Sequence, residues 1–329
     1  NTVAVITDGS AVLGLGNIGP EAAYPVMSGK AVIFKEFAGI DAFPICLATQ
    51  DVDEIVMICK NLAPSFAGIN LEDIAAPRCF EIERQLQNIG IPVMHDDQHG
   101  TAVVVLAALI NAAKVVGKKL EQCRITICGL GAAGTAISLM VNEFAGGKAI
   151  INPVDIDGLV CTGNNKKGYK AAVCDRINYS NIKGALKEAM VGADVFIGVS
   201  APNIVTEEMV SSMANDAIVF ALANPVSEID PELAAKAGAK IIATGRSDFP
   251  NQVNNALAFP GIFKGALKAH ATTITPKMKL AAAMALAGTI NPAAKKILPN
   301  PLDKKVVNVI AKEVEKTAIA EGVVRNKCS

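Results

Sequence analysis

The stretch RITICGLGAAGTAISLMVNEFAGGKAIINPVD, residues 124–155, decides the fold of this sequence. It opens with a short apolar run, passes through glycines at positions 129, 131 and 134 into a helix-like segment, and ends with a second apolar run that reaches Asp155. This order of strand, G-x-G-x-x-G turn, helix and acid-tipped strand is the dinucleotide-binding fingerprint. The glycines permit a tight turn and a close approach of the backbone to a pyrophosphate, which the helix N-terminus attracts.

The turn and the acid are expected to make different contacts with a dinucleotide. The pyrophosphate would lie against the backbone of the turn, which consists of Gly129, Gly131, Ala132, Ala133 and Gly134. Asp155 would accept hydrogen bonds from the adenosine ribose and repel a 2′-phosphate, which favours NAD over NADP. Asp157 adds negative charge nearby, but Lys166 and Lys167 follow and could reach a 2′-phosphate, so NADP stays possible. The alternative is a strand-helix turn that uses glycine only for packing.

Short strand-like and helix-like segments alternate on both sides of this stretch. Such alternation is typical of a doubly wound parallel sheet, and the 51% hydrophobic content fits strands that are buried on both faces. We therefore expect an α/β fold in which residues 100–275 form a Rossmann-like NAD(P)-binding domain. Residues 1–99 are expected to form a smaller α/β catalytic domain that binds substrate and metal, and residues 276–329 to form C-terminal helices.

The composition excludes several classes of protein. The 31 basic residues balance 31 acidic ones among 329, so net charge favours neither nucleic acid nor an anionic membrane as a partner. The longest apolar run, Ala102–Ile110, has about half the length of a membrane span. The eight cysteines include no C-x-x-C pair, so we expect small buried hydrophobes in a reducing cytoplasm rather than a disulfide framework or a zinc–thiolate site. No secretory leader precedes the strand-like start at Asn1, and that abrupt start suggests a missing upstream segment.

The first hundred residues mix short strands with turn signals. We expect strands over 3–7, 30–34, 43–49 and 91–95, and a helix over 52–62. A second G-x-G-x-x-G, at Gly14, Gly16 and Gly19, is followed at once by Pro20, so no regular helix is expected there. It is either a bare turn or a loop whose N–H groups meet a small anion.

Two acidic pairs follow apolar, strand-like runs in this part of the chain. They are Glu72-Asp73 in INLEDI and Asp96-Asp97 in MHDDQHG. Adjacent acids at the ends of buried strands are costly unless a cation or a base neutralises them. Three carboxylates together with water suit a hard divalent ion such as Mg²⁺ or Mn²⁺. The alternative is that these are solvated acids in turns.

Two histidines flank the second acidic pair with the i, i+4 spacing of a zinc hydrolase. That motif needs His95 and His99 on one helix face, whereas Pro92 precedes them and Gly100 follows at once. We expect loop histidines that support other groups rather than zinc ligands.

A lysine and several amides complete the candidate site. Lys30 opens the apolar run KAVIF and is either a solvated strand end or a base whose pKa burial and a cation lower into the working range. Asn224 in ALANP, and Asn254 and Asn255 in QVNNALAFPG, follow expected strands at the sheet edge where α/β ligands bind. Asparagine is also common in ordinary turns.

Taken together, these segments resemble malic enzymes of the small prokaryotic-type subunit. The matching runs keep their order over most of residues 1–270, and they are VITDGSAVLGLGNIGPEA, GKAVIFKEFAGIDAFPICL, INLEDIAAPRCFEIE, HDDQHGTAVV, GLGAAG, FALANP and TGRSDFPNQVNNALAFPGI. The resemblance implies oxidative decarboxylation of (S)-malate to pyruvate and CO₂ with reduction of NAD(P)⁺, dependent on Mg²⁺ or Mn²⁺.

The resemblance also implies roles for individual residues. Lys30 matches the general base, and Asp96 matches the carboxylate that pairs with it. The family's metal ligands correspond to Glu72, Asp73 and Asp97. Its substrate-holding amides correspond to Asn224 and Asn255, and its cofactor loop corresponds to residues 129–134.

Two departures from the family pattern stand out. The family's catalytic acid is a tyrosine in an upstream Y-[ST]-P-G-V-A segment, but the three tyrosines here, Tyr24, Tyr169 and Tyr179, lie in no such motif. Either the sequence begins after that stretch, or the chain is truncated, or this copy is impaired. Larger eukaryotic relatives carry an arginine before LGLG where this chain has Ser10 and Ala11, so the glycine loop and the asparagines would hold the substrate carboxylate.

Two other function classes share some of these features. Amino-acid dehydrogenases also combine a lysine with a Rossmann domain, but they need no divalent metal, which leaves the two acidic pairs unexplained. A cofactor-binding relative that has lost catalysis would explain the absent tyrosine segment. The high apolar content and the closing helices also suggest a homodimer or higher homo-oligomer.

Overall fold

The computed structural model describes residues 1–162 and 165–325, which form two compact units. Unit 1 consists of Asn1–Val104, Asn255–Thr289 and the described part of Asn300–Ser329. Unit 2 consists of Val105–Asn254 and Ile290–Pro299. The chain therefore leaves unit 1 and returns to it twice.

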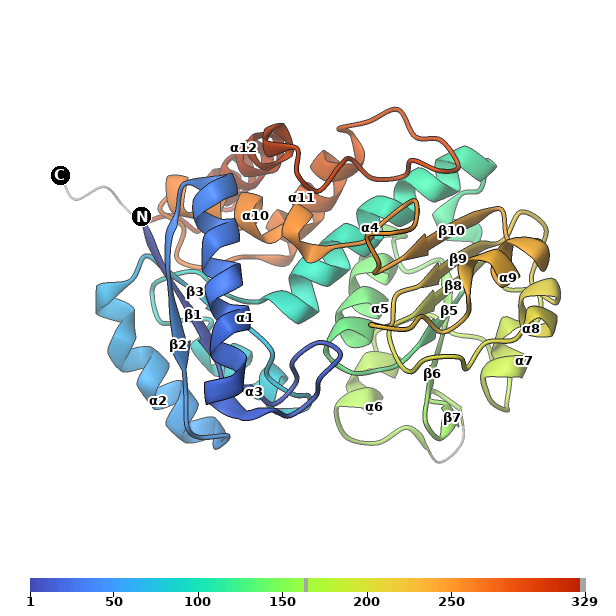
Figure 1. Ribbon diagram of the computed structural model, residues 1–329, viewed down its shortest axis with the longest axis horizontal. Coiled ribbons are helices and arrows are strands. Elements are labelled where there is room, and N and C mark those ends of the chain that lie inside the picture. Colours follow the sequence, from blue (N-terminus) through green and yellow to red (C-terminus); the bar gives the residue numbers. More distant parts are fainter. Residues whose placement is uncertain (163–164, 326–329) are drawn as a thin grey trace. The chain divides into compact units, whose positions relative to one another are not determined.

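Unit 1 contains a four-stranded, all-parallel sheet in the order β2-β1-β3-β4, of which Figure 1 labels β1, β2 and β3. The strands are β1 (Thr2–Thr7), β2 (Asp41–Cys46), β3 (Gly68–Leu71) and β4 (Val93–His95). In β1 the residues Val3 to Ile6 are fully buried, because helices cover both faces of the sheet. The strands predicted over 3–7, 43–49 and 91–95 are confirmed.

Helices α1 (Gly19–Ile33), α2 (Val52–Leu62) and α3 (Arg78–Leu86) connect these strands. Right-handed crossovers in this strand order put α1 on one face and α2 and α3 on the other. The helix predicted over 52–62 is confirmed as α2, and Asp51 caps it by accepting the N–H groups of Asp53 and Glu54.

The later segments of unit 1 add η5 (Asn255–Leu257), α10 (Phe259–Lys268), α11 (Pro276–Ala287) and α12 (Lys304–Ala320). Phe34, just after α1, packs edge-on against Phe259 and Phe263 of α10, with ring centroids 4.8 and 5.4 Å away. Helix α12 packs along α10, and Lys268 Nζ lies 3.0 Å from Glu315 Oε2 between them. Residues far apart in the sequence thus build one core.

Unit 2 contains a six-stranded sheet in the order β10-β9-β8-β5-β6-β7, parallel except for the β6–β7 pair. The strands are β5 (Arg124–Cys128), β6 (Ile150–Asp155), β7 (Gly158–Leu159), β8 (Val195–Gly198), β9 (Ile218–Ala221) and β10 (Ile241–Thr244). The chain steps from β5 to β6 on one side and to β8 on the other. The predicted doubly wound, Rossmann-like sheet is confirmed.

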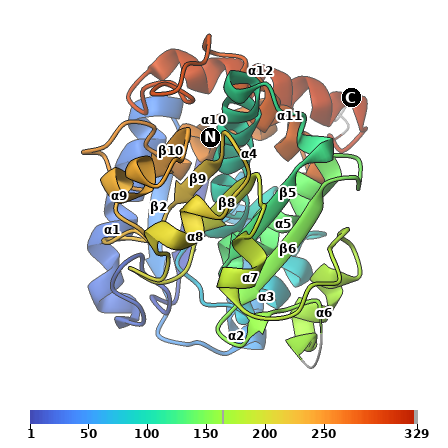
Figure 2. The same ribbon diagram turned by 90° about the vertical axis from the view of Figure 1, so that its right-hand side faces the viewer.

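The helices of unit 2 lie on the two faces of this sheet. Helix α5 (Ala132–Phe144) connects β5 to β6, whereas α6 (Gly168–Cys174), α7 (Leu186–Met190), α8 (Glu207–Ser211) and α9 (Pro231–Lys236) belong to the connections from β7 to β10. Figure 2 shows α7 and α8 in front of β8. The reversal of direction at β5 leaves the carboxyl ends of β5 and β6 at the topological switch point.

Helix α4 (Asp96–Val116) corrects two predictions. It begins directly after β4 and includes His99 and Gly100, so the expectation of a loop at 95–99 is wrong. It is also the one described helix that is long and apolar enough to cross a membrane, but 67% of its most apolar window is buried in the protein. It is a core helix of this fold.

The predicted strand at 30–34 is also wrong, because residues 30–33 form the last turn of α1. Pro20 does not prevent this helix. A proline in the first turn lacks an N–H that would have no partner there, and its fixed φ suits the helix. Lys30 is therefore presented from a helix rather than from a strand.

The expectation of unpaired cysteines is wrong at one place. Cys161 and Cys174 form a disulfide, and Cys174 is the last residue of α6. Among the described residues, Cys46, Cys59, Cys79, Cys123 and Cys128 are free. Cys328 lies outside the described residues.

Candidate active site

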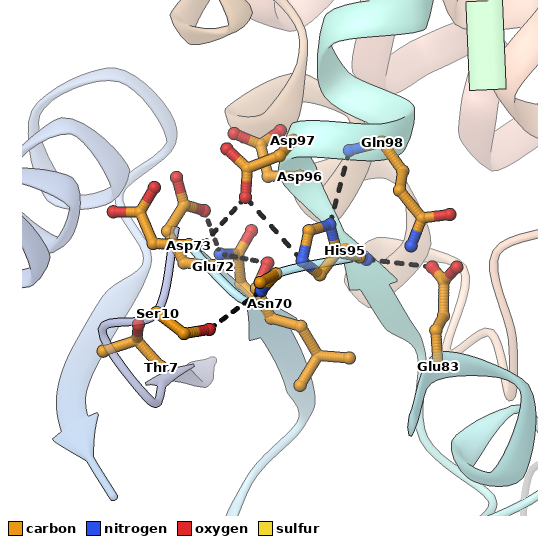
Figure 3. A network of polar contacts seen from close by, with 12 residues as sticks. Thr7, Ser10, Asn70, Glu72, Asp73, Glu83, His95, Asp96, Asp97 and Gln98 are labelled. Atoms are coloured by element: carbon orange, nitrogen blue, oxygen red, sulfur yellow. Dashed lines mark hydrogen bonds and ion pairs between the residues drawn. The ribbon is translucent and has the colours of Figure 1, made fainter. Parts of the chain in front are cut away.

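Two neighbouring strands of unit 1 carry the acidic pairs. Glu72 and Asp73 follow β3, and Asp96 and Asp97 follow β4 as the first residues of α4. Because β3 and β4 are parallel, with Leu71 opposite His95, the two pairs emerge at the same edge of the sheet (Figure 3). The prediction that both pairs lie at the ends of buried strands is confirmed.

Three of these acids form a compact group. One carboxylate oxygen each from Glu72, Asp73 and Asp97 lie within 4.8 Å of one another. Backbone and amide groups hold two of them: Asp97 Oδ2 accepts the N–H of Asp73 at 2.8 Å, and Glu72 Oε2 accepts the Nδ2 group of Asn70 at 2.8 Å. Oxygen-only ligands at this spacing suit a hard divalent cation.

The electrostatics of the group point to the same kind of ligand. Burial and the charges of Asp97 and Glu72 raise the pKa of Asp73 to about 9. Burial also raises the pKa of Glu72, Asp96 and Asp97. These four carboxyl groups have a single ammonium, that of Lys30, close to them. A divalent cation would neutralise the excess negative charge.

Lys30 provides that ammonium from the last turn of α1. Its Nζ lies 2.6 Å from Glu72 Oε1, forms an ion pair with Asp96, and sits 4.0 Å from the centre of the Phe259 ring. Its side chain is only 7% exposed. The structure therefore brings Lys30 and the four acids together in unit 1, as predicted.

The pKa of Lys30 differs from the expectation. Burial acts to lower it, but the charges of Asp96, Glu72 and Asp97 outweigh burial, so the pKa of Lys30 lies above its ordinary value. The family resemblance implied the pairing of Lys30 with Asp96, but sequence reasoning missed its contact with Glu72.

One of the two predicted amides lies at this site. Asn255, in η5, donates from Nδ2 to Asp96 Oδ2 at 2.7 Å. It lies eleven positions after Thr244, the last residue of β10, and belongs to unit 1 rather than to the sheet of unit 2 that contains β10, so its expected place at the edge of that sheet is wrong. Asn224 does follow β9, in unit 2, where its Nδ2 donates to the carbonyl of Leu222 at 3.3 Å.

A buried polar network supports the acids from behind (Figure 3). Glu83 of α3 accepts the backbone N–H of His95 at 2.9 Å and contacts His99 Nε2 at 2.9 Å. Burial acts to raise the pKa of Glu83, but His99 and Lys279 lower it to about 2. Burial lowers the pKa of both histidines.

The first glycine motif uses several of its N–H groups within the turn itself. The N–H groups of Val12, Leu15, Gly16, Ile18 and Gly19 all donate to carbonyls within residues 9–16. Instead, the segment before it holds the acidic loop: Ser10 Oγ accepts the N–H of Ala75 at 2.9 Å, and Asp8 pairs with Arg78 at 3.1 Å. Sequence reasoning missed these supports, because only the fold brings residues 8–10 next to residues 75–78.

The second glycine motif has the geometry that close backbone approach requires. Gly129 has φ +96°, and a methyl group on Gly134 would lie 1.8 Å from the Gly129 carbonyl oxygen. A methyl group on Gly131 would meet nothing within 4 Å. Gly131 precedes the first turn of α5, so the open space faces a helix N-terminus that attracts phosphate.

Asp155, at the end of β6, has a partner that sequence reasoning missed. Lys170 of α6 forms an ion pair with it, whereas Lys166, one of the two lysines predicted to reach this region, pairs with Asp175 at 2.5 Å. Tyr169, beside Lys170, donates to the carbonyl of Leu130 in the glycine turn at 2.8 Å. Helix α6 thus contacts both the turn and the acid.

Comparison with known proteins identifies the family. Residues 1–87 match the family described as "Malic enzyme, N-terminal domain", and residues 98–319 match "Malic enzyme, NAD binding domain". The chain belongs to the malic enzyme family. This family comprises decarboxylating malate oxidoreductases that use NAD or NADP, and the chain is one of these enzymes. The alternative of a metal-independent amino-acid dehydrogenase is wrong.

Several malic enzymes are similar over nearly the whole chain. The NAD-dependent malic enzyme of Geobacillus stearothermophilus is 53% identical, with 99% of this chain and 68% of that protein covered. The NADP-dependent malic enzyme of Escherichia coli is 43% identical, with 98% of this chain but 45% of that protein covered. The crystal structure of the NAD-dependent malic enzyme from Thermotoga maritima has a TM-score of 0.92 at 50% identity, covering 96% of this chain and 84% of that one.

Proposed function

We propose that unit 1 binds malate and a divalent cation, that unit 2 binds NAD(P)⁺, and that Lys30 is the general base of the oxidative decarboxylation. The supporting observation is that one buried ammonium contacts Glu72 and Asp96 beside three clustered carboxylates. In this reaction Lys30 would accept the proton of the C2 hydroxyl, and bound NAD(P)⁺ would supply the acceptor for the C2 hydride. Loss of the C4 carboxyl group as CO₂ then leaves an enolate that must be protonated at C3.

The donor set fits Mg²⁺ or Mn²⁺ held by Glu72, Asp73 and Asp97. When bound, such an ion would supply Lewis acidity toward the C2 oxygen of the substrate. A cation on Glu72 and Asp97 would also offset two of the three negative charges that raise the pKa of Lys30. Burial, the largest single influence on Lys30, would continue to favour the neutral amine that a base requires.

Asp96 and Asn255 act on Lys30 rather than on the substrate in this scheme. Asp96 is fully buried and holds the lysine, and Asn255 in turn donates to Asp96. Asn224 of unit 2 is proposed to hold substrate through its amide. We assign the protonation of C3 to none of the three tyrosines, because none lies in the family motif.

For the cofactor, we propose binding of the pyrophosphate along Gly129, Gly131, Ala132, Ala133 and Gly134. Asp155 at the tip of β6 favours NAD, because its carboxylate accepts ribose hydroxyl groups and repels a 2′-phosphate. Its ion pair with Lys170 reduces that repulsion, which is consistent with some use of NADP.

Replacement of the base tests the proposal. Lys30→Ala should lower kcat by ~10²–10⁴-fold, the usual effect of removing a positioned acid–base group. Lys35→Ala is the matched control, because Lys35 is five residues away and 64% exposed. Near-normal malate-dependent reduction of NAD⁺ by the Lys30 variant would overturn the assignment. Absence of that reaction in the unmodified chain would favour the catalytically impaired relative instead.

Titration with Mn²⁺ tests the cation site separately. Asp97→Asn should weaken Mn²⁺ binding strongly, whereas Asp53→Asn, on the exposed side of α2, should leave it unchanged. Equal Mn²⁺ affinities for the two variants would contradict the proposed ligands.

We also propose a cytoplasmic homodimer that needs neither nucleic acid nor membrane. Large apolar side chains are exposed on α1 and β2, including Tyr24, Val32 and Phe43. Light scattering should give twice the mass of the chain, and a monomer at micromolar concentration would contradict this.

A further inference from the structure

His95 carries a buried ring nitrogen whose role the catalytic scheme leaves open. The residue ends β4, is fully buried, and lies two positions before Asp97. Its Nε2 forms no hydrogen bond of ordinary geometry among the described residues, although the backbone of Ile74 interacts with the ring, and Asp97 Oδ2 lies 3.7 Å from Nε2. Figure 3 shows the ring lying beside Asp97 on the side away from Asp73.

The other ring nitrogen decides where the proton lies. His95 Nδ1 accepts the backbone N–H of Gln98 at 3.3 Å. A backbone N–H can only donate, so Nδ1 cannot carry a proton in this arrangement. Because an imidazole ring always carries at least one proton, the proton must be on Nε2, the nitrogen that faces Asp97.

The ring is held firmly in that orientation. The backbone N–H of His95 donates to Glu83 Oε1 at 2.9 Å, and the other oxygen of Glu83 contacts His99. The strand pairing of His95 with Leu71 fixes its register in the sheet, and Leu71 directly precedes Glu72. The Nε2–H group is therefore held 3.7 Å from Asp97 Oδ2.

We propose that His95 is a positioning residue for the cation site, with its Nε2–H directed at Asp97 Oδ2. The same oxygen already accepts the backbone N–H of Asp73 at 2.8 Å. At 3.7 Å the Nε2–H group is too far for a hydrogen bond but attracts the same oxygen electrostatically, so the two N–H groups together favour one rotation of the carboxylate. That oxygen is thereby turned toward protein N–H groups, and the other is left to the cation. Hydrogen-bonded supports of this kind orient metal ligands in many proteins. The inference rests on the proposed role of Asp97 as a ligand.

Two substitutions of His95 separate its hydrogen bond from its packing. His95→Leu removes the donor, and we expect about a 10–100-fold weaker Mn²⁺ affinity, the usual cost of losing such a support. His95→Gln keeps a donor near the position of Nε2 and should retain most of the affinity. Mn²⁺ binding is measured by calorimetry or by the electron paramagnetic resonance signal of the free ion, without reference to turnover. Unchanged affinity in His95→Leu, or equal loss in His95→Gln, would overturn the inference.

A nuclear magnetic resonance measurement on the unmodified protein keeps the inference testable if the variants fold poorly. The chain has three histidines, so the ¹⁵N resonances of His95 can be assigned by comparison with His99→Gln and His270→Gln. We expect the tautomer with the proton on Nε2. A proton on Nδ1 would overturn the inference.

A double variant distinguishes this inference from the proposed cation site itself. If His95 acts through Asp97, adding His95→Leu to Asp97→Ala should weaken Mn²⁺ binding no further. An additional loss equal to that of the single His95 variant would show that His95 acts independently of Asp97. If Asp97→Ala binds Mn²⁺ normally, the cation site has failed rather than the role of His95 alone.

Discussion

Gly100 lies one turn after Asp96 in α4, and replacing it with alanine gives a sharp test of the site. Alanine normally stabilises a helix relative to glycine by roughly 0.5–1 kcal/mol. Here, however, the new methyl group would lie 1.7 Å from Asp96 Oδ1 and 2.8 Å from its Cγ. Since both atoms are too close, rotation of the carboxylate alone does not relieve the clash.

The size of the effect follows from these distances. Oδ1 must retreat by at least about 1.3 Å to reach the 3.0 Å limit below which Cβ contacts are essentially never found. Asp96 has little room for this, because its carboxylate contacts both Lys30 and Asn255. Overpacking of this kind costs about 1–3 kcal/mol, which offsets the gain in helix propensity. A displacement of about 1 Å near the chemistry can cost roughly 10²-fold in rate.

We therefore expect Gly100→Ala to lower kcat by about 10²-fold or more while the net loss of stability stays below about 2.5 kcal/mol. Gly29→Ala is the matched control, because Gly29 lies within α1 and a methyl group there meets nothing within 4 Å. It should retain kcat and gain roughly 0.5–1 kcal/mol of stability. Steady-state kinetics and urea unfolding of both variants provide the comparison. Wild-type kcat in Gly100→Ala would refute the reasoning that Asp96 must stay where it holds Lys30.

Three further predictions concern the cation, the cofactor and the disulfide. Because the pKa of Asp73 is raised to about 9 from an ordinary value near 4, protein without a cation should lose stability as the pH rises between these values. Mn²⁺ at a fixed concentration of 100 times its Kd at pH 8 should then add about 2.7 kcal/mol at pH 8 and less at pH 5, as measured by urea unfolding; a larger effect at pH 5 would contradict this sign. Asp155→Ser should shift the ratio of kcat/KM values toward NADP by about tenfold or more, because it removes the repulsion and frees Lys170 for a 2′-phosphate; an unchanged ratio would remove Asp155 from cofactor selection. Cys161→Ser should cost up to about 3 kcal/mol for a loop of this length, and a reductant should affect the unmodified protein but not the variant; equal sensitivity of both would contradict a structural role.

The elements that sequence patterns predict well here are those with a local physical cause. The strand, glycine turn and helix over residues 124–144 are encoded by adjacent residues, and the structure confirms them. The meeting of the two acidic pairs could also be inferred, because parallel strands deliver their carboxyl ends to one edge. These inferences need only the direction of the strands.

Other features depend on contacts that adjacent residues do not reveal. The run KAVIF has strand-like composition, yet packing of Phe34 against α10 favours a helix that carries Lys30 inward. The helical start at Asp96 was hidden by Gly100, which is required there by the Asp96 carboxylate rather than by a turn. Lys170 and Glu83 were missed for the same reason: each acts through a partner distant in the sequence.

The interrupted path of unit 1 has a consequence for synthesis on the ribosome. Its sheet emerges first, but Asn255 and α10, which complete the surroundings of Lys30, follow more than 150 residues later, and α12 later still. A nascent chain must therefore carry a partly uncovered sheet, with the buried acids exposed, while unit 2 is translated and folds. Chaperone binding should therefore be strongest while unit 2 is being translated. Expression of the chain as two separate halves would leave Lys30 without the helix that encloses it.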